Sequence, residues 1–319
     1  MKNAIFRRLV LTGILATLLA ASTILQVENT QLVSAIDDKS KQTETLPRVD
    51  PVEPPPEPSV EPTPTPTPSP TVANIEAIRA KLKADGCNLL SDPGVVKREL
   101  GRCKFLMIGD SLGNNLGYGM ISQLNYKTGL TFTLKAKAST GLSNAWFYNW
   151  HNNLATFLKT YKPNLVIVFL GANDRQNYVV NGVVQTFGTE AWKKTYRSNI
   201  TRLASSATKA GAYVLWIGMP IMKPYNYAKG ITLIDEQFAL AVPKVPGATY
   251  LPLRAYTADA QGNYRQSAYV NGKYSVIRGD DGIHFSWLGQ HVIATYTINA
   301  INRTYHVRLV PNNPRYITR

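Results

Sequence analysis

Short apolar runs recur along the chain from about residue 104 onward and set its expected architecture. The runs have the length of buried strands and are bounded by Gly, Pro or Asn. They lie at 104–109, 164–170, 212–218 and 248–253. Helical patterns separate or follow them, at 190–210, 231–242 and 287–303. Strands alternating with helices predict an α/β fold, a three-layer α/β/α sandwich in which helices cover both faces of a central parallel sheet.

The stretch 256–279 interrupts this alternation. It is rich in Tyr, Gly and Asn and shows no clear period, so we expect a loop or a hairpin there. Ligands of a parallel sheet bind beyond the carboxyl ends of its strands. Chemistry is therefore expected in the residues that directly follow each strand.

The first 35 residues predict export. Lys2, Arg7 and Arg8 precede an apolar run at 9–25, which is the basic and then apolar pattern of a secretory signal. Small residues at 33–35 resemble a cleavage site but lie well beyond the apolar run, and the run is just long enough to span a bilayer. Residues 1–35 are therefore either a cleaved signal peptide or an uncleaved inner-membrane anchor. The protein is expected in the periplasm or at the cell surface.

Residues 36–71 have the composition of a linker. Proline makes up 11 of the 24 residues between 47 and 70, and such segments form stiff polyproline spacers instead of a packed core. The linker is either a passive tether or a peptide that a partner recognises. Residues 72–319 then form the folded domain.

Positive charge is concentrated in that domain. Residues 72–319 hold 29 basic and 12 acidic side chains. A field of this sign raises the local concentration of anions. The expected partner of an exported protein is an acidic cell-envelope glycan or wall polymer, and not nucleic acid. A basic surface that only interacts with solvent is the alternative.

Cys87 and Cys103 are the only cysteines of the chain. In an oxidising compartment such a pair is expected to form a disulfide, and a loop of this size would stabilise the fold by about 3 kcal/mol. The alternative is two small buried thiols.

Three polar segments follow expected strands, the second of them after a further strand expected to end near Ala138. Gly-Asp-Ser-Leu-Gly at 109–113 matches the G-x-S-x-G pattern and presents Ser111 at a strand-to-helix turn. Ser-Thr-Gly-Leu at 139–142 contains Gly141, whose backbone N–H can approach a ligand closely. Gly-Ala-Asn-Asp at 171–174 offers the Asn173 amide as a donor to a developing oxyanion. Each segment alone is equally consistent with an ordinary turn or helix cap.

A fourth segment, Asp-Gly-Ile-His-Phe at 281–285, lies before the last predicted helix. A carboxylate three residues before an imidazole can orient the ring and stabilise the imidazolium that forms when the ring takes a serine proton. Only His284 has this setting. The other histidines, at 151, 291 and 306, are expected at the surface or in helix packing.

Together these four segments resemble the SGNH (GDSL) hydrolase family. The family has Gly-Asp-Ser-Leu after the first strand, a glycine after the second, Gly-x-Asn-Asp after the third and Asp-x-x-His before the final helix, and all four occur here in that order. The resemblance covers about 104–303. It implies a flavodoxin-like fold and no cofactor or metal.

The resemblance also implies a role for each motif residue. Ser111 would be the nucleophile, His284 its base and Asp281 the residue that orients the base. The oxyanion hole would consist of the Ser111 and Gly141 backbone N–H groups and the Asn173 side chain. The chain departs from commoner members in having Gly-Asn-Asn at 113–115, where a serine is often found, which leaves the shape of the substrate open.

The segments at 138–142 and 279–286 look most like an envelope-located SGNH group often described only as a domain of unknown function. Its understood relatives deacetylate or acetylate wall and exopolysaccharide sugars. By analogy we expect an exported esterase that removes O-acyl groups, chiefly O-acetyl, from an envelope polysaccharide or peptidoglycan through an acyl-enzyme. An O-acyltransferase, a lipase or thioesterase, and a non-catalytic glycan-binding module are the alternatives.

Two features bear on substrate choice. Aromatic residues at 146–148 and 150 either stack on sugars, line an acyl slot or pack in the core. Arg175, two residues after Asn173, is the candidate for contacting an anion near the site; an exposed charge without that role is the alternative.

Overall fold

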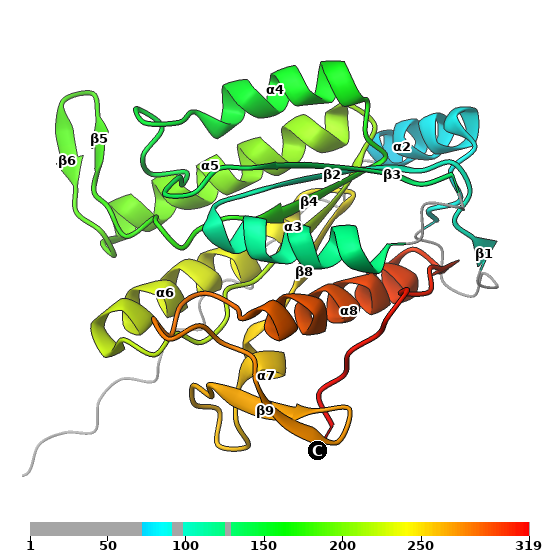
Figure 1. Ribbon diagram of the computed structural model, residues 1–319. Helices are drawn as coiled ribbons and strands as arrows, with labels where there is room; N and C mark the ends of the chain where they lie inside the picture. The colour runs from blue at the N-terminus through cyan, green and yellow to red at the C-terminus, as the bar shows by residue number, and fades with distance from the viewer. Residues whose placement is uncertain (1–71, 91–97, 125–128, 319) are drawn as a thin grey trace, which may run out of the picture. The chain divides into compact units, whose positions relative to one another are not determined.

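The computed structural model describes residues 72–90, 98–124 and 129–318 (Figure 1). The signal or anchor expected at 1–35 and the linker expected at 36–71 lie outside the described residues. Within the described ranges, no helix is long and apolar enough to cross a membrane.

Five parallel strands form the central sheet, in the order β3-β2-β4-β7-β8. The three middle strands are almost entirely buried, as expected for a sheet covered on both faces. The four apolar runs predicted four of these strands within about two residues at each end, and the strand expected to end near Ala138 ends at Ala136. The strands are β2 (Lys104–Gly109), β3 (Thr131–Ala136), β4 (Leu165–Phe169), β7 (Tyr213–Ile217) and β8 (Ala248–Leu251).

Helices cover both faces of this sheet. The helices α3 and α8 pack against each other on one face, and α4 and α5 lie on the other, where α5 also contacts α2 and α6 (Figure 1). This arrangement is the three-layer α/β/α sandwich that the sequence predicted. The helices are α2 (Val72–Asp85), α3 (Ser111–Gln123), α4 (Trp150–Tyr161), α5 (Glu190–Lys209), α6 (Tyr225–Ala241), the short α7 (Arg254–Thr257), the 3₁₀ turn Val242–Lys244 and α8 (Trp287–Thr304).

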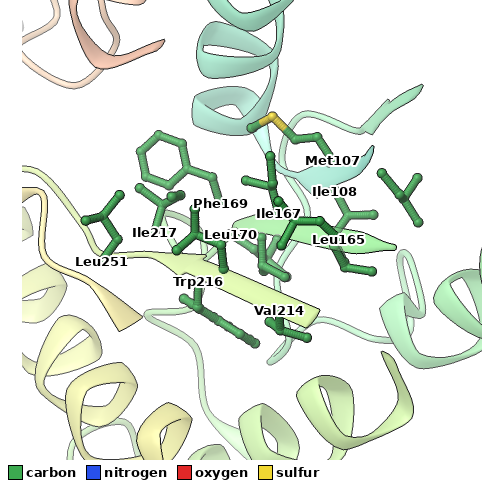
Figure 2. Close-up of a cluster of buried hydrophobic side chains, with 14 of the residues drawn as sticks. Met107, Ile108, Leu165, Ile167, Phe169, Leu170, Val214, Trp216, Ile217 and Leu251 are labelled. Atoms are coloured by element: carbon green, nitrogen blue, oxygen red, sulfur yellow. The ribbon is translucent and has the colours of Figure 1, made fainter. Parts of the chain in front are cut away.

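Side chains of the middle strands fill the core on both sides of the sheet. Figure 2 shows Ile167 and Phe169 of β4 beside Trp216 and Ile217 of β7. Burial of one such side chain contributes about 1.5–3 kcal/mol. The packed core fixes the strand ends, and so the loops that follow them.

Two hairpins project from the sandwich. The first joins β5 (Tyr178–Val180) to β6 (Val183–Gln185), and the second joins β9 (Ser267–Val270) to β10 (Lys273–Val276). Both turn through Asn-Gly with positive φ at each residue, 51° and 77° in the first and 50° and 80° in the second, which is the type I′ requirement. The second hairpin lies in the stretch predicted to be a loop or a hairpin.

Helix α6 begins six residues before its predicted start. Its N-cap is Pro224, and its first turns carry Tyr225, Asn226, Tyr227 and Lys229. Polar residues and Gly230 interrupt the apolar period in these turns, so the sequence pattern predicted only the part of α6 from residue 231 onward.

Cys87 and Cys103 form a disulfide, the pairing that the sequence predicted. Cys103 directly precedes β2, so the bridge fastens the segment after α2 to the start of that strand. It lies at the amino end of the strand, opposite the end that Ser111 follows. A two-stranded ladder, β1 (Arg98–Glu99) with β11 (Val307–Arg308), ties the same region to the C-terminal segment.

Candidate active site

Ser111 is the first residue of helix α3, and only Asp110 separates it from the end of strand β2. The side chain of Asp110 caps the helix by accepting a hydrogen bond from the Leu112 backbone N–H at 2.9 Å. The serine hydroxyl thus lies at the positive end of the helix dipole, which favours negative charge. No partner is found within the described residues for the backbone N–H of Ser111.

Ser111, His284 and Asp281 form a hydrogen-bonded row. The distance from His284 Nε2 to Ser111 Oγ is 2.8 Å, and from His284 Nδ1 to Asp281 Oδ2 it is 2.5 Å. Because a carboxylate can only accept, Nδ1 carries the proton and Nε2 is left to accept from the serine hydroxyl. The structure therefore brings together the three residues that the sequence named as nucleophile, base and orienting acid.

Asp281 is held in its ionised form. Burial by itself would raise the pKa of Asp281, but hydrogen bonds from the His284 ring and from the Ile283 and His284 backbone N–H groups lower that pKa to about 2. At neutral pH the carboxylate can therefore balance an imidazolium charge on His284.

Asp110 joins the loop after β2 to the loop after β4. Its Oδ2 accepts from the backbone N–H groups of Gly171 and Ala172 at 3.0 and 2.9 Å. The side chain is fully buried, and this burial raises the pKa of Asp110 to about 6 although its backbone hydrogen bonds act in the opposite direction. The carboxyl fixes the position of Asn173 relative to Ser111.

The other two predicted oxyanion donors come from adjoining loops that are also linked. Asn173 Nδ2 donates to the Thr140 carbonyl at 3.0 Å, which leaves its second N–H available. The Gly141 backbone N–H has no partner among the described residues. A side chain at position 141 would overlap Asp174, so glycine is required there by close approach.

Asp174 and Trp150 hold these loops in place through hydrogen bonds. Asp174 is buried, which raises its pKa, and it accepts from the Ser143 backbone N–H and hydroxyl and from the Tyr196 hydroxyl. Trp150 Nε1 donates to Thr140 Oγ1 at 3.0 Å. Trp150 is therefore a core residue, whereas Trp146 and Phe147 are 83% and 46% exposed.

Arg278 holds the segment that carries Asp281 and His284. Its side chain is fully buried, and its guanidinium donates to the carbonyls of Ile221, at 2.7 Å, and Ile283, at 2.8 Å, with longer bonds to Gly282 and His284. It also lies over the rings of Tyr264 and Phe285. Burial lowers the pKa of Arg278 to about 10, so it remains charged at neutral pH.

Asn115 connects helix α3, which begins with Ser111, to the segment that carries His284. Its Oδ1 accepts from the Phe285 backbone N–H at 3.0 Å. This residue belongs to the segment where the chain departs from commoner SGNH members, and the structure gives it a positioning contact beside His284.

The remaining predicted residues lie outside the row. Arg175 is exposed, with its guanidinium 5.3 Å from the centre of the Tyr227 ring. His151 contacts Asn199 and Arg202, and His291 of α8 contacts Ser122 of α3. Among the residues that the structure describes, no group of His, Cys, Asp or Glu is arranged to hold a metal ion.

Sequence reasoning missed the supporting residues. Asp110 and Asp174 belong to the motifs that the sequence showed. The sequence did not show that both carboxylates are buried and hold the loops together. Arg278 gave no signal, because its partners are main-chain carbonyls and one of them lies 57 residues away.

Comparisons with known proteins bear on the family. A family model described as "Protein of unknown function (DUF459)" matches residues 104–300, more than half of the chain. This agrees with the resemblance to an SGNH group often described only as a domain of unknown function. Among curated proteins, nothing matches the chain.

Several solved structures resemble the chain at low identity. An α/β-hydrolase enzyme from the metagenome of Lake Arreo is 12% identical with a TM-score of 0.45, covering 63% of this chain and 96% of its own. A psychrotrophic esterase from Pseudoalteromonas is 15% identical (TM-score 0.41; 63% and 97% covered). A GDSL-like lipase from Bacteroides thetaiotaomicron is 13% identical (TM-score 0.44; 72% and 98%). At these values the likenesses carry no argument about activity.

Proposed function

The chain belongs to the family described as "Protein of unknown function (DUF459)", and from the geometry of its site we propose that it is an exported serine esterase of the SGNH type. The proposal assigns it the removal of O-acyl groups, chiefly O-acetyl, from a cell-envelope polysaccharide or peptidoglycan. The observation that carries the chemistry is the row Ser111, His284 and Asp281, with contacts of 2.8 and 2.5 Å.

The first half of the reaction forms an acyl-enzyme. Ser111 Oγ attacks the ester carbonyl carbon while its proton passes to His284 Nε2. The carbonyl oxygen becomes an oxyanion facing the Ser111 and Gly141 N–H groups and the Asn173 amide, donors held in place before the charge develops. When the tetrahedral intermediate collapses, the C–O bond to the sugar breaks and the sugar oxygen takes the proton from Nε2.

The second half releases the acyl group. A water molecule attacks the acyl carbon, its proton passes to His284 Nε2, and the proton then returns to Ser111 Oγ as the carboxylic acid leaves. Asp281 stays ionised through both halves, consistent with its low pKa. These steps need no metal or cofactor from outside the chain.

The choice of an envelope polymer rests on the sequence. The N-terminal 35 residues have the pattern of an export signal, the proline-rich segment provides reach, and residues 72–319 carry 29 basic side chains against 12 acidic ones. The exposed rings of Trp146 and Phe147 follow the Gly141 loop and offer apolar surface on which sugar faces can stack.

Ester hydrolysis tests the proposal directly. We expect hydrolysis of 4-nitrophenyl acetate that disappears in Ser111→Ala, and a slower rate on the long-chain 4-nitrophenyl palmitate. Acetate release from an O-acetylated polysaccharide would identify the polymer. Faster palmitate hydrolysis would indicate a lipase, transfer of acetyl to an added sugar would indicate a transferase, and no turnover of any ester would leave only a glycan-binding module.

A further inference from the structure

A hollow of about 420 Å³ lies beside the loop that carries Asn173. It is lined by Arg175, two residues after Asn173, and by residues of the first three turns of α6. The residues leading into α5, 187–189, complete it. The hollow adjoins the site but contains none of the residues assigned to the chemical steps.

Arg175 is held in a defined position at this hollow. Its guanidinium lies 5.3 Å from the centre of the Tyr227 ring, and the Tyr227 hydroxyl donates to the carbonyl of Ala172, the residue before Asn173. Gly230, one turn further along α6, has no side chain, and a Cβ there would overlap Arg175 Nε. Glycine inside a helix is unfavourable by about 1 kcal/mol relative to alanine; here it makes room for the arginine.

A second cation lines the same hollow. Lys229 Nζ lies 5.2 Å from the centre of the Tyr225 ring. Within the described residues, neither Lys229 nor Arg175 has a carboxylate partner, and no Asp or Glu lines the hollow. Glu190, next to the lining, is paired with Lys193 at 2.8 Å. The two positive charges are therefore not neutralised by the protein.

The remaining lining suits a sugar. Asn226 provides an amide, while Phe187 and Leu233 provide apolar surface. The Thr189 hydroxyl, also in the lining, already donates to the Thr186 carbonyl and caps α5. A sugar unit with a negative group has the same combination of apolar faces, hydroxyls and charge. The planar guanidinium of arginine can bind a carboxylate or phosphate through two parallel hydrogen bonds.

We propose that this hollow binds an anionic group, carboxylate or phosphate, on a sugar of the substrate polymer, with Arg175 as the main contact and Lys229 as the second. The proposal rests on the proposed function, because it assigns the hollow to the same substrate whose ester faces Ser111. The polymer would then lie with a charged unit against α6 and its ester-bearing unit at the catalytic row.

Binding measured without turnover tests this separately from the chemistry. Isothermal titration calorimetry on the full-length Ser111→Ala protein would use trigalacturonate as the carboxylate probe, glucose 1-phosphate as the phosphate probe and maltotriose as the neutral control. We expect at least one anionic probe to bind more tightly than maltotriose, and the tighter anion identifies the charged group. Failure of both anionic probes to bind overturns the proposal. Failure of the proposed function would appear elsewhere, as absent Ser111-dependent ester hydrolysis.

Three substitutions in the same background locate the binding. Arg175→Gln should weaken binding of the anionic probe about tenfold, the loss expected for one charged contact. Gly230→Ala should weaken it as well without loss of folding, because the new Cβ displaces the guanidinium. Lys244→Gln removes the same charge at an exposed residue beyond the C-terminal end of α6 and should change nothing.

The control decides between a site and a general charge effect. Equal weakening by Lys244→Gln, or wild-type affinity in Arg175→Gln, overturns the proposal. So does equal weakening of maltotriose and the anionic probe by Arg175→Gln, since that would indicate a role in shape and not in charge. Melting curves of each variant establish that the protein is folded.

Discussion

Two serine–histidine pairs connect α3 with α8 or the segment just before it, and only one of them has a carboxylate behind its imidazole. Ser111 is the first residue of α3 and contacts His284, just before α8. Ser122 is in the last turn of α3 and contacts His291, in the second turn of α8, at 2.7 Å. The two hydroxyl-to-imidazole distances are nearly equal, so distance alone does not distinguish the pairs.

The group behind each imidazole does distinguish them. His284 Nδ1 donates to the Asp281 carboxylate, whereas His291 Nδ1 donates to the Trp287 backbone carbonyl at 2.7 Å. Both partners fix the same tautomer. Only the carboxylate carries the charge that stabilises an imidazolium.

The position on α3 separates the serines further. Ser111 is at the helix N-terminus, where unpaired N–H groups favour an anion, and Ser122 is at the C-terminus, where carbonyls disfavour one. Ser122 Oγ lies 3.1 Å from the Gly119 carbonyl of its own helix. The comparison teaches that a short serine–histidine contact does not by itself identify a catalytic pair, because the two contacts differ only in the groups around them.

The largest expected difference is between the two serines themselves. Ser111→Ala should lower kcat for 4-nitrophenyl acetate by at least about 10⁴-fold, because the acyl-enzyme can no longer form, while Ser122→Ala should leave turnover unchanged. A fluorophosphonate should label Ser111 alone, as read by peptide mass spectrometry. Label on Ser122, or an active Ser111→Ala protein, would contradict the assignment.

The orienting groups provide the next test. Asp281→Asn should lower kcat by about 10³- to 10⁴-fold, because an amide neither fixes the same tautomer nor balances the imidazolium charge. His291→Gln is the matched control, with unchanged kcat and a lower melting temperature from the lost α3–α8 contact. Steady-state kinetics and melting curves on the same preparations measure both effects; equal losses of kcat would show that the pairs are not distinct.

A substitution at Asn173 tests the oxyanion donors proposed around Ser111, which have no counterpart around Ser122. Asn173→Ala should lower kcat by about 100- to 1000-fold with a small change in KM, since the donor acts once charge has developed on the carbonyl oxygen. The lost bond to the Thr140 carbonyl should also lower the free energy of unfolding by about 1 kcal/mol. Turnover within about threefold of wild type, together with a lower melting temperature, would make Asn173 a structural residue only.

Asp110 supports only the Ser111 end of α3, and its pKa predicts a pH dependence. The folded-state pKa of Asp110, about 6, lies above the ordinary aspartate value of 3.8 because the carboxyl is buried, so folding favours the protonated form. Its stabilising contribution is present below pH 4 and is lost as the pH rises through 6, by on the order of 3 kcal/mol. Asp110→Asn has no carboxyl to titrate and should lack this slope.

Urea unfolding of wild type, Asp110→Asn and Ser122→Ala between pH 4 and 7 measures this dependence. Ser122→Ala should keep the wild-type slope. Parallel curves for wild type and Asp110→Asn would mean that the three backbone N–H groups outweigh burial and keep the carboxylate ionised.

Local signals in the sequence predicted most of the fold and the three residues that the structure brings together in one row, Ser111, His284 and Asp281. Apolar runs identified four of the five sheet strands, and three of these four are almost entirely buried. Each motif is a continuous stretch of a few residues, so it can be recognised in the sequence without knowledge of the fold. The β5–β6 hairpin was missed although Asn181-Gly182 between valine pairs is a strong hairpin signal.

The residues that the sequence did not predict act over long separations. Arg278 binds a carbonyl 57 residues away, and the Arg175 hollow depends on Tyr227 and Gly230 in a part of α6 that the pattern did not predict. Likewise, nothing local separates His291 from His284 except the aspartate three residues earlier. Such contacts exist only once the sheet has brought the loops together.

The contacts of Arg278 show where the specificity of this protein can be redesigned. One guanidinium ties the Asp281–His284 segment to the Ile221 carbonyl after β7, so random substitutions at 279–284 would displace two loops at once and give mostly inactive clones. Trp146 and Phe147 are exposed, with ring centres 6.0 Å apart, and Lys137 lies over the Phe147 ring. A mutant library directed at those two positions would vary this exposed surface while His284 keeps its position.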